Sequence, residues 1–236
     1  MKTIARVLPL LAALPRLPRL PRLLPLLACL AAFAVVALAF AVAGCSIVPG
    51  ARPDPTRYYV LAVPGQFPAS ASLAGKSDAL AVGLRHVQIA PYLDHREIVL
   101  RVGPNETVYQ PYARWAEPLG AAIQQQIALR FLRSGKISRL LPEPFPFDTR
   151  RAVDVSIRVT RCEGLRKPDG RMVASFAAVI ETSDPASGTI LSRQGFSAPE
   201  IPWDGRDFAA LAGALSESVA RVSDALLATL TLPGKP

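Results

Sequence analysis

Histidine and cysteine, the residues that most often bind transition metals or act as catalytic groups, are scarce in this sequence. The chain contains two histidines, His86 and His95, and three cysteines. No His-x-x-x-His or Cys-x-x-Cys pair offers a metal site, and no Gly-x-Ser-x-Gly elbow or nucleotide-binding glycine pattern occurs. We therefore expect a protein that is not an enzyme and that uses no cofactor or metal. A hydrolase that places a histidine beside a nucleophile is the alternative that motifs alone leave open.

Acidic residues are absent from the first 44 positions, where the apolar run Leu23–Val42 follows a basic segment. The basic side chains of that segment are Lys2, Arg6, Arg16, Arg19 and Arg22. A basic stretch, then an apolar one, then small residues is the order of a secretory signal. The run is also long enough for a membrane-spanning helix, which is the alternative. We favour the signal, because the run ends in small residues and no basic cluster follows directly.

A cysteine follows the small residues at the end of the apolar run. Val42-Ala43-Gly44-Cys45 matches the bacterial lipobox, in which the cysteine is acylated and becomes the new N-terminus. We therefore expect a signal peptide at 1–44, a proline-rich tether at 45–57 and a folded domain at 58–232, with Cys45 as the lipid-attachment residue. An aspartate after the cysteine would favour the inner membrane. Ser46 stands there instead, which favours the outer membrane.

Net charge gives little reason to expect a nucleic-acid partner. The formal charge is +9, but five of the 27 basic residues belong to the predicted signal, which leaves 22 basic against 18 acidic residues. The densest basic stretches, 130–139 and 158–167, are expected to be solvated faces, with contact to anionic lipid head groups as the alternative. Cys162 would have no intrachain partner once Cys29 is removed and Cys45 is acylated, so we expect it to be buried as a small apolar residue.

Hydrophobic periodicity predicts an α/β fold: a single domain with a mixed β-sheet of about five main strands and two long amphipathic helices. Strands are expected at 58–63, 79–90, 97–103, 151–164, 171–182 and 189–198, and an irregular crossing at 140–148. A helix should begin near Glu117 and end at 134–135, with a stripe headed by Trp115, which we expect to be a core anchor. The last helix should span 207–230, capped by Asp204 or Asp207.

Two motifs in the first half of the folded domain resemble a known family. The stretches are "VGLRHVQIAPYLDHREIVLRVGPNE" (82–106) and "YARWAEPLGAAIQQQIALRFL" (112–132), a few residues beyond the lipobox and "TRYYVL". The motif residues are Pro91, Tyr92, Leu93, Asp94, Ile98 and Val99, and Arg114, Trp115, Ala116, Glu117, Pro118 and Leu119. This pattern resembles the ABC-type transport auxiliary lipoprotein family of the PqiC/YmbA type. The half after Leu140 resembles the family in layout only.

The resemblance implies a non-catalytic outer-membrane lipoprotein that faces the periplasm. Such a subunit serves an MCE-domain transport protein and its inner-membrane permease in lipid transport and so maintains the envelope. A stand-alone envelope lipid-binding or outer-membrane assembly lipoprotein is the alternative. The membrane partner would be lipid, through acylated Cys45.

Three loops are candidates for contact with the transport partner: 64–75, 90–97 and 141–148. Aromatic and proline residues in exposed loops make plausible anchors, so we expect Phe67, Tyr92 and Phe145 to contact the MCE-domain protein. A closed cyclic arrangement of several copies around one tubular partner is a further expectation.

Overall fold

The computed structural model describes residues 23–44, 53–62, 80–146 and 149–230, and the chain divides into two compact units, Met1–Asp54 and Pro55–Pro236. In the first unit, the apolar run forms helix α1 (Leu23–Gly44). Among the described residues, no helix has both the length and the apolar character needed to cross a membrane. The lipobox cysteine Cys45 and the loop 64–75 lie outside the described residues.

The second unit is built on one mixed sheet of ten strands, so the expectation of about five main strands was too low. The strands are β1 (Arg57–Tyr59), β2 (Leu80–Leu84), β3 (Gln88–Ile89), β4 (Glu97–Gly103), β5 (Glu106–Trp115), β6 (Ile137–Pro142), β7 (Val153–Arg166), β8 (Met172–Ser183), β9 (Ile190–Ser197) and β10 (Ile201–Trp203). Several of the additional strands have only two or three residues, which is too short to leave a period-2 pattern in the sequence.

Strand β7 organises this sheet. One edge of β7 pairs antiparallel with β8 over almost its whole length, while the other edge pairs in parallel with β2, β3 and β4 in turn. The sheet then extends from β2 to β6, from β4 through β5 to β1, and from β8 to both β9 and β10. Parallel neighbours of this kind require long connections, and helix α2 (Leu119–Arg133) lies in the connection from β2 to its parallel neighbour β6.

Two sequence expectations about strands were wrong for local reasons. The predicted strand 79–90 is split, because residues 85–87 face only two β7 residues, Ser156 and Ile157, and the extra residue interrupts the ladder. The first part of the expected irregular crossing at 140–148 belongs to β6. Pro142 is tolerated there because β6 is an edge strand that pairs only with β2.

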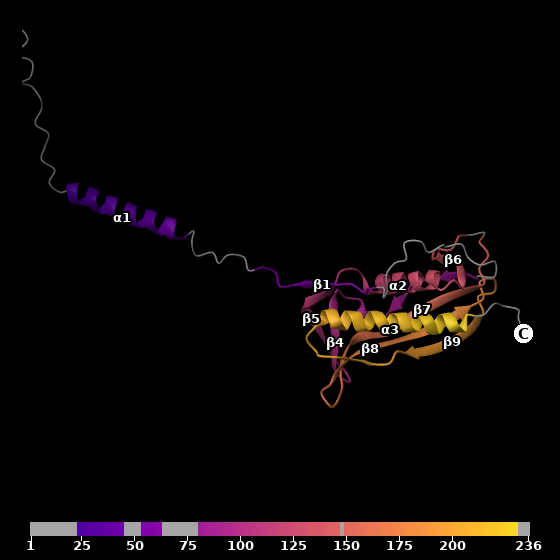
Figure 1. Ribbon diagram of the computed structural model, residues 1–236. Coiled ribbons are helices and arrows are strands. Elements are labelled where there is room, and N and C mark those ends of the chain that lie inside the picture. Colours follow the sequence, from indigo (N-terminus) through magenta and orange to yellow (C-terminus); the bar gives the residue numbers. More distant parts are fainter. Residues whose placement is uncertain (1–22, 45–52, 63–79, 147–148, 231–236) are drawn as a thin grey trace, which may run out of the picture. The chain divides into compact units, whose positions relative to one another are not determined.

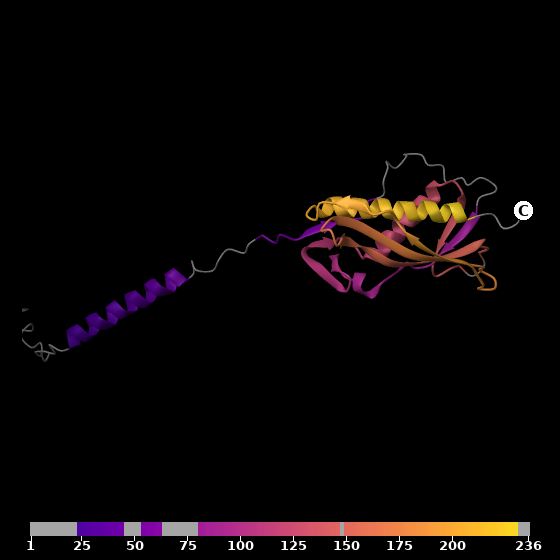
Figure 2. The same cartoon turned by 90° about the horizontal axis from the view of Figure 1, so that it is seen from below.

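Helices α2 and α3 (Phe208–Thr229) contact each other and lie on the same side of the sheet (Figures 1 and 2). The predicted apolar stripe of α2 is confirmed: Ile123, Ile127 and Phe131 are fully buried. Helix α3 buries a stripe of its own, which includes Leu211 and Val219. Asp207 caps α3 through its carboxylate, which accepts from the backbone N–H groups of residues 209 and 210.

The sheet face opposite these helices, called the open face below, is covered by neither α2 nor α3 (Figure 2). Along β7, the residues Val153, Val155, Ile157 and Val159 are buried, whereas Arg158 and Thr160 on the other parity are exposed. The predicted alternation of β7 is therefore confirmed. Asp154 is the exception on the polar side, because it is buried.

Candidate docking site on the open face

The two described loops that the sequence marks as partner contacts lie toward opposite ends of β7. Residues 143–146 contact the start of this strand through Arg85 and Arg151, which bind Asp154. The 3-10 turn η1 (Pro91–Leu93) contacts the strand farther on, where the Tyr92 hydroxyl donates to the Thr160 carbonyl at 3.0 Å. The polar side of β7 therefore connects two loops that are far apart in the sequence.

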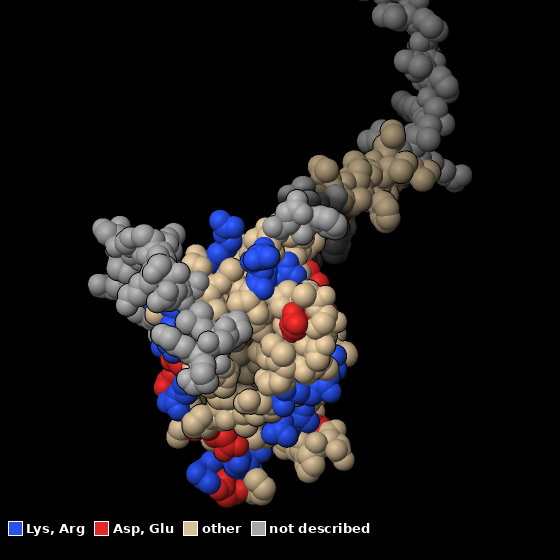
Figure 3. Space-filling view, turned by 90° about the vertical axis from the view of Figure 1, so that its right-hand side faces the viewer, with Lys and Arg blue, Asp and Glu red and all other residues tan. Residues whose placement is uncertain are grey.

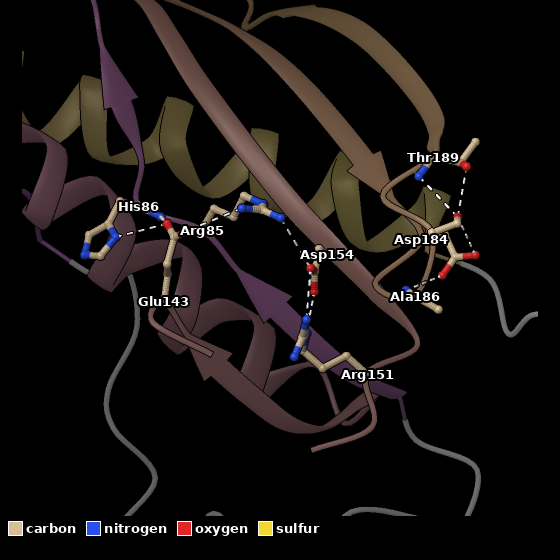
Figure 4. A network of polar contacts seen from close by, with 9 residues as sticks. Arg85, His86, Glu143, Arg151, Asp154, Asp184, Ala186 and Thr189 are labelled. Carbon is tan, nitrogen blue, oxygen red and sulfur yellow. Dashed lines mark hydrogen bonds and ion pairs between the residues drawn. The ribbon is translucent and has the colours of Figure 1, made fainter. Parts of the chain in front are cut away.

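The first end is a network of ion pairs (Figure 4). Arg85, just after β2, lies 3.3 Å from Glu143 and 3.6 Å from Asp154. Arg151 donates to the same aspartate through Nε at 2.6 Å. The Glu143 carboxylate also accepts from the backbone N–H and ring of His86, and these hydrogen bonds lower the pKa of Glu143. Asp154 thus pairs with two arginines, which offsets the cost of burying its charge.

Phe145 belongs to this network and is not a free anchor. Its ring is half-buried, with the guanidinium carbon of Arg151 4.2 Å and that of Arg85 5.5 Å from its centroid. Cation–π contacts of this kind hold the ring against the two arginines. Phe145 therefore fixes the position of the loop as well as contributing to its surface.

The second end is a cluster around the buried carboxylate of Glu163. Arg101 on β4 donates to Glu163 at 2.6 Å, and the Arg101 guanidinium lies 5.2 Å from the ring centroid of Tyr92. Burial, and next the negative charge of Glu163, raise the pKa of Tyr92 to about 12. The Tyr92 carbonyl accepts a hydrogen bond from the Tyr109 hydroxyl. Tyr92 is thus held in place on both sides, as a neutral phenol at physiological pH.

Between the two ends lies a groove of about 500 Å³. Its polar lining consists of Arg85, Gln88, Ser156, Arg158, Glu181 and Arg193. Arg193 is paired with Glu181 at 2.6 Å, whereas Arg158 donates to the neutral side chain of Gln88 at 3.1 Å. On the face shown in Figure 3, basic side chains form separate groups, some beside acidic ones. The lining of the groove is polar and carries charges of both signs.

The two sequence motifs meet in space at the far edge of the sheet. Arg114 pairs with Glu97 at 3.3 Å, and the backbone N–H of Trp115 donates to the Arg96 carbonyl at 2.7 Å. Leu93 and Leu119 are buried core residues, and Pro118 is the N-cap of α2. The remaining motif residues, Pro91, Asp94 and Glu117, lie at the turn and before the helix. These motif residues form the contacts around η1 and the start of α2.

A family model agrees with this reading of the motifs. The model of the ABC-type transport auxiliary lipoprotein component matches residues 59–226, which is nearly all of the second unit. The chain belongs to this family. It is a transport auxiliary family and not an enzyme family, and its lipoprotein character is consistent with a membrane-anchored domain.

Solved structures support the fold of this auxiliary lipoprotein. A protein from Xanthomonas campestris is 19% identical, with a TM-score of 0.61 over 73% of this chain and 93% of its own. An uncharacterised protein is 14% identical, with a TM-score of 0.52 over 75% of this chain and 99% of its own. At these identities the likeness concerns the fold alone. No curated protein matches the chain.

Two kinds of reactive group can be assessed among the described side chains of the auxiliary lipoprotein: metal-ligand clusters and the Cys162 thiol. No group of three or more potential metal ligands occurs in the residues that the structure covers. The Cys162 thiol is buried, and this burial raises its pKa, so it is a poor nucleophile. The burial of Glu163 and the groove that Arg158 lines were not predicted from the sequence. The only sequence signal for these residues was the alternation of polar and apolar residues along β7. This alternation does not show which polar residues are covered by a loop.

Proposed function

We propose that this protein is the non-catalytic outer-membrane lipoprotein subunit of a Pqi-like MCE/ABC-type lipid transport system and that it maintains envelope integrity. The observation that carries the proposal is the family match over residues 59–226, directly after a lipobox cysteine. Its task is to hold a folded docking domain at the membrane for a transport partner.

The anchor in this proposal is Cys45. Acyl chains contribute about 0.8 kcal/mol for each buried methylene, so one chain anchors weakly and a triacylated cysteine anchors firmly. Because Ser46 follows the cysteine, the proposal places the anchor in the outer membrane with the domain in the periplasm. A domain held there cannot itself contact the inner membrane, so the partner must cross the periplasm.

The partner in this proposal is an MCE-domain protein, which links the lipoprotein to an inner-membrane permease. We assign its contact to the open face, because the groove there lies between the two described loops predicted to dock. Phe67, Tyr92 and Phe145 remain the proposed contact residues. A cyclic arrangement of several copies around one tubular partner also remains part of the proposal, and the mass of the purified native protein tests it.

Photo-crosslinking in cells tests the docking face. A photoreactive residue is placed at Phe67, Tyr92, Phe145 or Gln88, and at Glu217 on the exposed side of α3 as a control. We expect crosslinks to an MCE-domain subunit from Phe67 and from the open-face positions Tyr92, Phe145 and Gln88, and none from Glu217. If these four positions capture only lipid or bulk envelope protein, the docking proposal fails. The stand-alone lipid-binding function then takes its place.

A further inference from the structure

Exposed apolar side chains are concentrated at one part of the folded unit. Outside α1, seven large apolar residues are exposed in the described chain. Five of them lie on β1, just after it, or on β5: Tyr58, Val60, Val108, Tyr109 and Tyr112. The other two, Ile190 and Leu191, are neighbours at the start of β9. The concentration of exposed apolar side chains on two paired strands indicates a surface that contacts another molecule or a membrane.

Three of these residues share one side of the β1–β5 pair. Tyr58 on β1 is in register with Arg114 on β5, and Tyr112 lies two positions before Arg114 on the same side of β5. The next pair in register, Tyr59 and Trp115, faces inward. Alternation along the strands therefore places Tyr58, Val60 and Tyr112 on the outward side. They are 58%, 55% and 58% exposed, and neither phenol has a hydrogen-bond partner among the described residues. We call these three residues the tyrosine surface.

The tyrosine surface lies where the chain enters the folded unit (Figure 1). Strand β1 is the first strand, and Arg57 lies only 12 positions after Cys45. Fully extended, a segment of that length spans about 40 Å at most. If Cys45 is acylated, β1 stays within that distance of the lipid.

We propose that Tyr58, Val60 and Tyr112 rest in the head-group region of the membrane that holds acylated Cys45. The inference uses the lipid anchor of the proposed function and adds which surface faces the bilayer. A tyrosine ring is apolar at its body and polar at its tip, and such rings are enriched at membrane–water interfaces. The neighbouring Arg57 is exposed and adds a cation for lipid phosphates.

The bilayer is the occupant that the position of the surface favours. A weak interfacial contact becomes effective when a short tether holds the two surfaces at high local concentration. The phenols of Tyr58 and Tyr112 can then donate hydrogen bonds to lipid head groups. The contact would restrict how the domain turns on its tether and keep one side of the domain against the membrane.

Probe accessibility in proteoliposomes tests this orientation. The full acylated protein receives one cysteine, at Tyr58, Val60, Tyr112 or Leu191, and an environment-sensitive fluorophore is attached to it. Cys162 is 2% exposed, so the new thiol is the accessible one. Leu191 is the control, since it is equally exposed but lies on β9. The vesicles contain phosphatidylethanolamine and phosphatidylglycerol, with nitroxides on head groups or on shallow acyl positions.

We expect blue-shifted emission and nitroxide quenching at positions 58, 60 and 112, and a water-like probe at position 191. The double variant Tyr58→Ser/Tyr112→Ser should abolish quenching of a probe at position 60, while Ile190→Ser/Leu191→Ser should leave it unchanged. Probes at the tyrosine surface that are as open to aqueous iodide as the probe at 191 would overturn the proposal. So would protection that requires a protein partner instead of lipid.

The anchor and the orientation can fail separately. A chain without fatty acid on Cys45 would leave the membrane fraction, and this outcome would contradict the anchor of the proposed function. An acylated, membrane-bound chain whose probes at positions 58, 60 and 112 are all exposed to water would contradict only the proposal that the tyrosine surface lies in the head-group region. Fatty-acid labelling of the same samples distinguishes these results.

Discussion

Trp115 joins three parts of the fold through one residue. Its side chain is 3% exposed within the core, at the end of β5 and shortly before α2 begins at Leu119. Its backbone N–H donates to Arg96, which precedes β4. The predicted role of a core anchor is confirmed. The neighbouring Arg114 makes the ion pair to Glu97 on the other side of the strand.

Replacing Trp115 by alanine should lower the free energy of unfolding by about 3–5 kcal/mol, because a large buried ring leaves a cavity. Denaturant unfolding of the protein measures this loss. Tyr112→Ala on the same strand is the matched control, and it should change stability by no more than about 0.5 kcal/mol because the ring is exposed. If Trp115→Ala lowers the free energy of unfolding by less than about 1 kcal/mol, the residue is an interface residue and not a core anchor.

Cys162 should resist thiol reagents in the folded protein and react once the chain is unfolded. Burial, and next the charge of Glu163, raise the pKa of its thiol above the unfolded value of about 8.5. A raised folded pKa means that the stability contribution is complete below about pH 8.5 and is lost as the pH rises further. Cys162→Ala should therefore flatten the decline in stability between about pH 8.5 and 10. Rapid labelling by a maleimide at pH 7 would contradict the buried position.

At the scale of elements, β2 and β7 approach closely because β2 carries a glycine. A Cβ added at Gly83 would clash with the Asp154 carboxylate and lie within 2.9 Å of the Arg151 side chain. This carboxylate is held by two arginines and cannot move aside without breaking the network. The network and the loop at Phe145 therefore depend on the absence of a side chain at one position in a neighbouring strand.

Gly83→Ala should destabilise the protein, by about 1–3 kcal/mol, because the added methyl group overpacks this contact. Gly213→Ala is the matched control. Gly213 lies inside α3 with nothing near its Cβ position, so alanine should stabilise the helix by about 0.5–1 kcal/mol. Thermal unfolding of both variants should give shifts of opposite sign. A Gly83→Ala protein as stable as the natural one would show that Asp154 and Arg151 can rearrange.

At the scale of the whole molecule, folding and anchoring belong to different parts of the chain. The core of the second unit begins with β1 and the residues after it, such as the buried Leu61. Cys45 belongs to the first unit. Loss of the anchor should therefore leave the folded unit intact.

Cys45→Ala should abolish membrane anchoring and leave the melting transition of the folded unit unchanged. Membrane fractionation and labelling with a radioactive fatty acid measure the first effect, and thermal unfolding measures the second. Ser46→Ala is the control that keeps the thiol. A Cys45→Ala protein that stays as firmly in the membrane as the natural one would refute the lipoprotein anchor.

Features whose causes lie close together in the chain could be predicted from the amino-acid sequence alone. The apolar stripe of α2, the cap at Asp207, the alternation along β7 and the hairpin strand 97–103 all follow from spacing within a few residues. The "PYLD" and "RWAEPL" motifs identified the family that the family model shows. Local sterics and burial patterns are sufficient for such features.

The distant segments that share the open face could not be predicted in this way, because the three-dimensional pairing of strands brings them together. Arg85 and Glu143 are 58 residues apart, and Tyr92 and Thr160 are 68 residues apart. Their contacts depend on β7 pairing with β2, β3 and β4 along one edge, and pairing between strands leaves no mark in either strand alone. The basic stretch 158–167 is expected from the sequence to be a solvated face. Partners from other strands decided that Asp154 and Glu163 are buried and that Arg158 lines a groove.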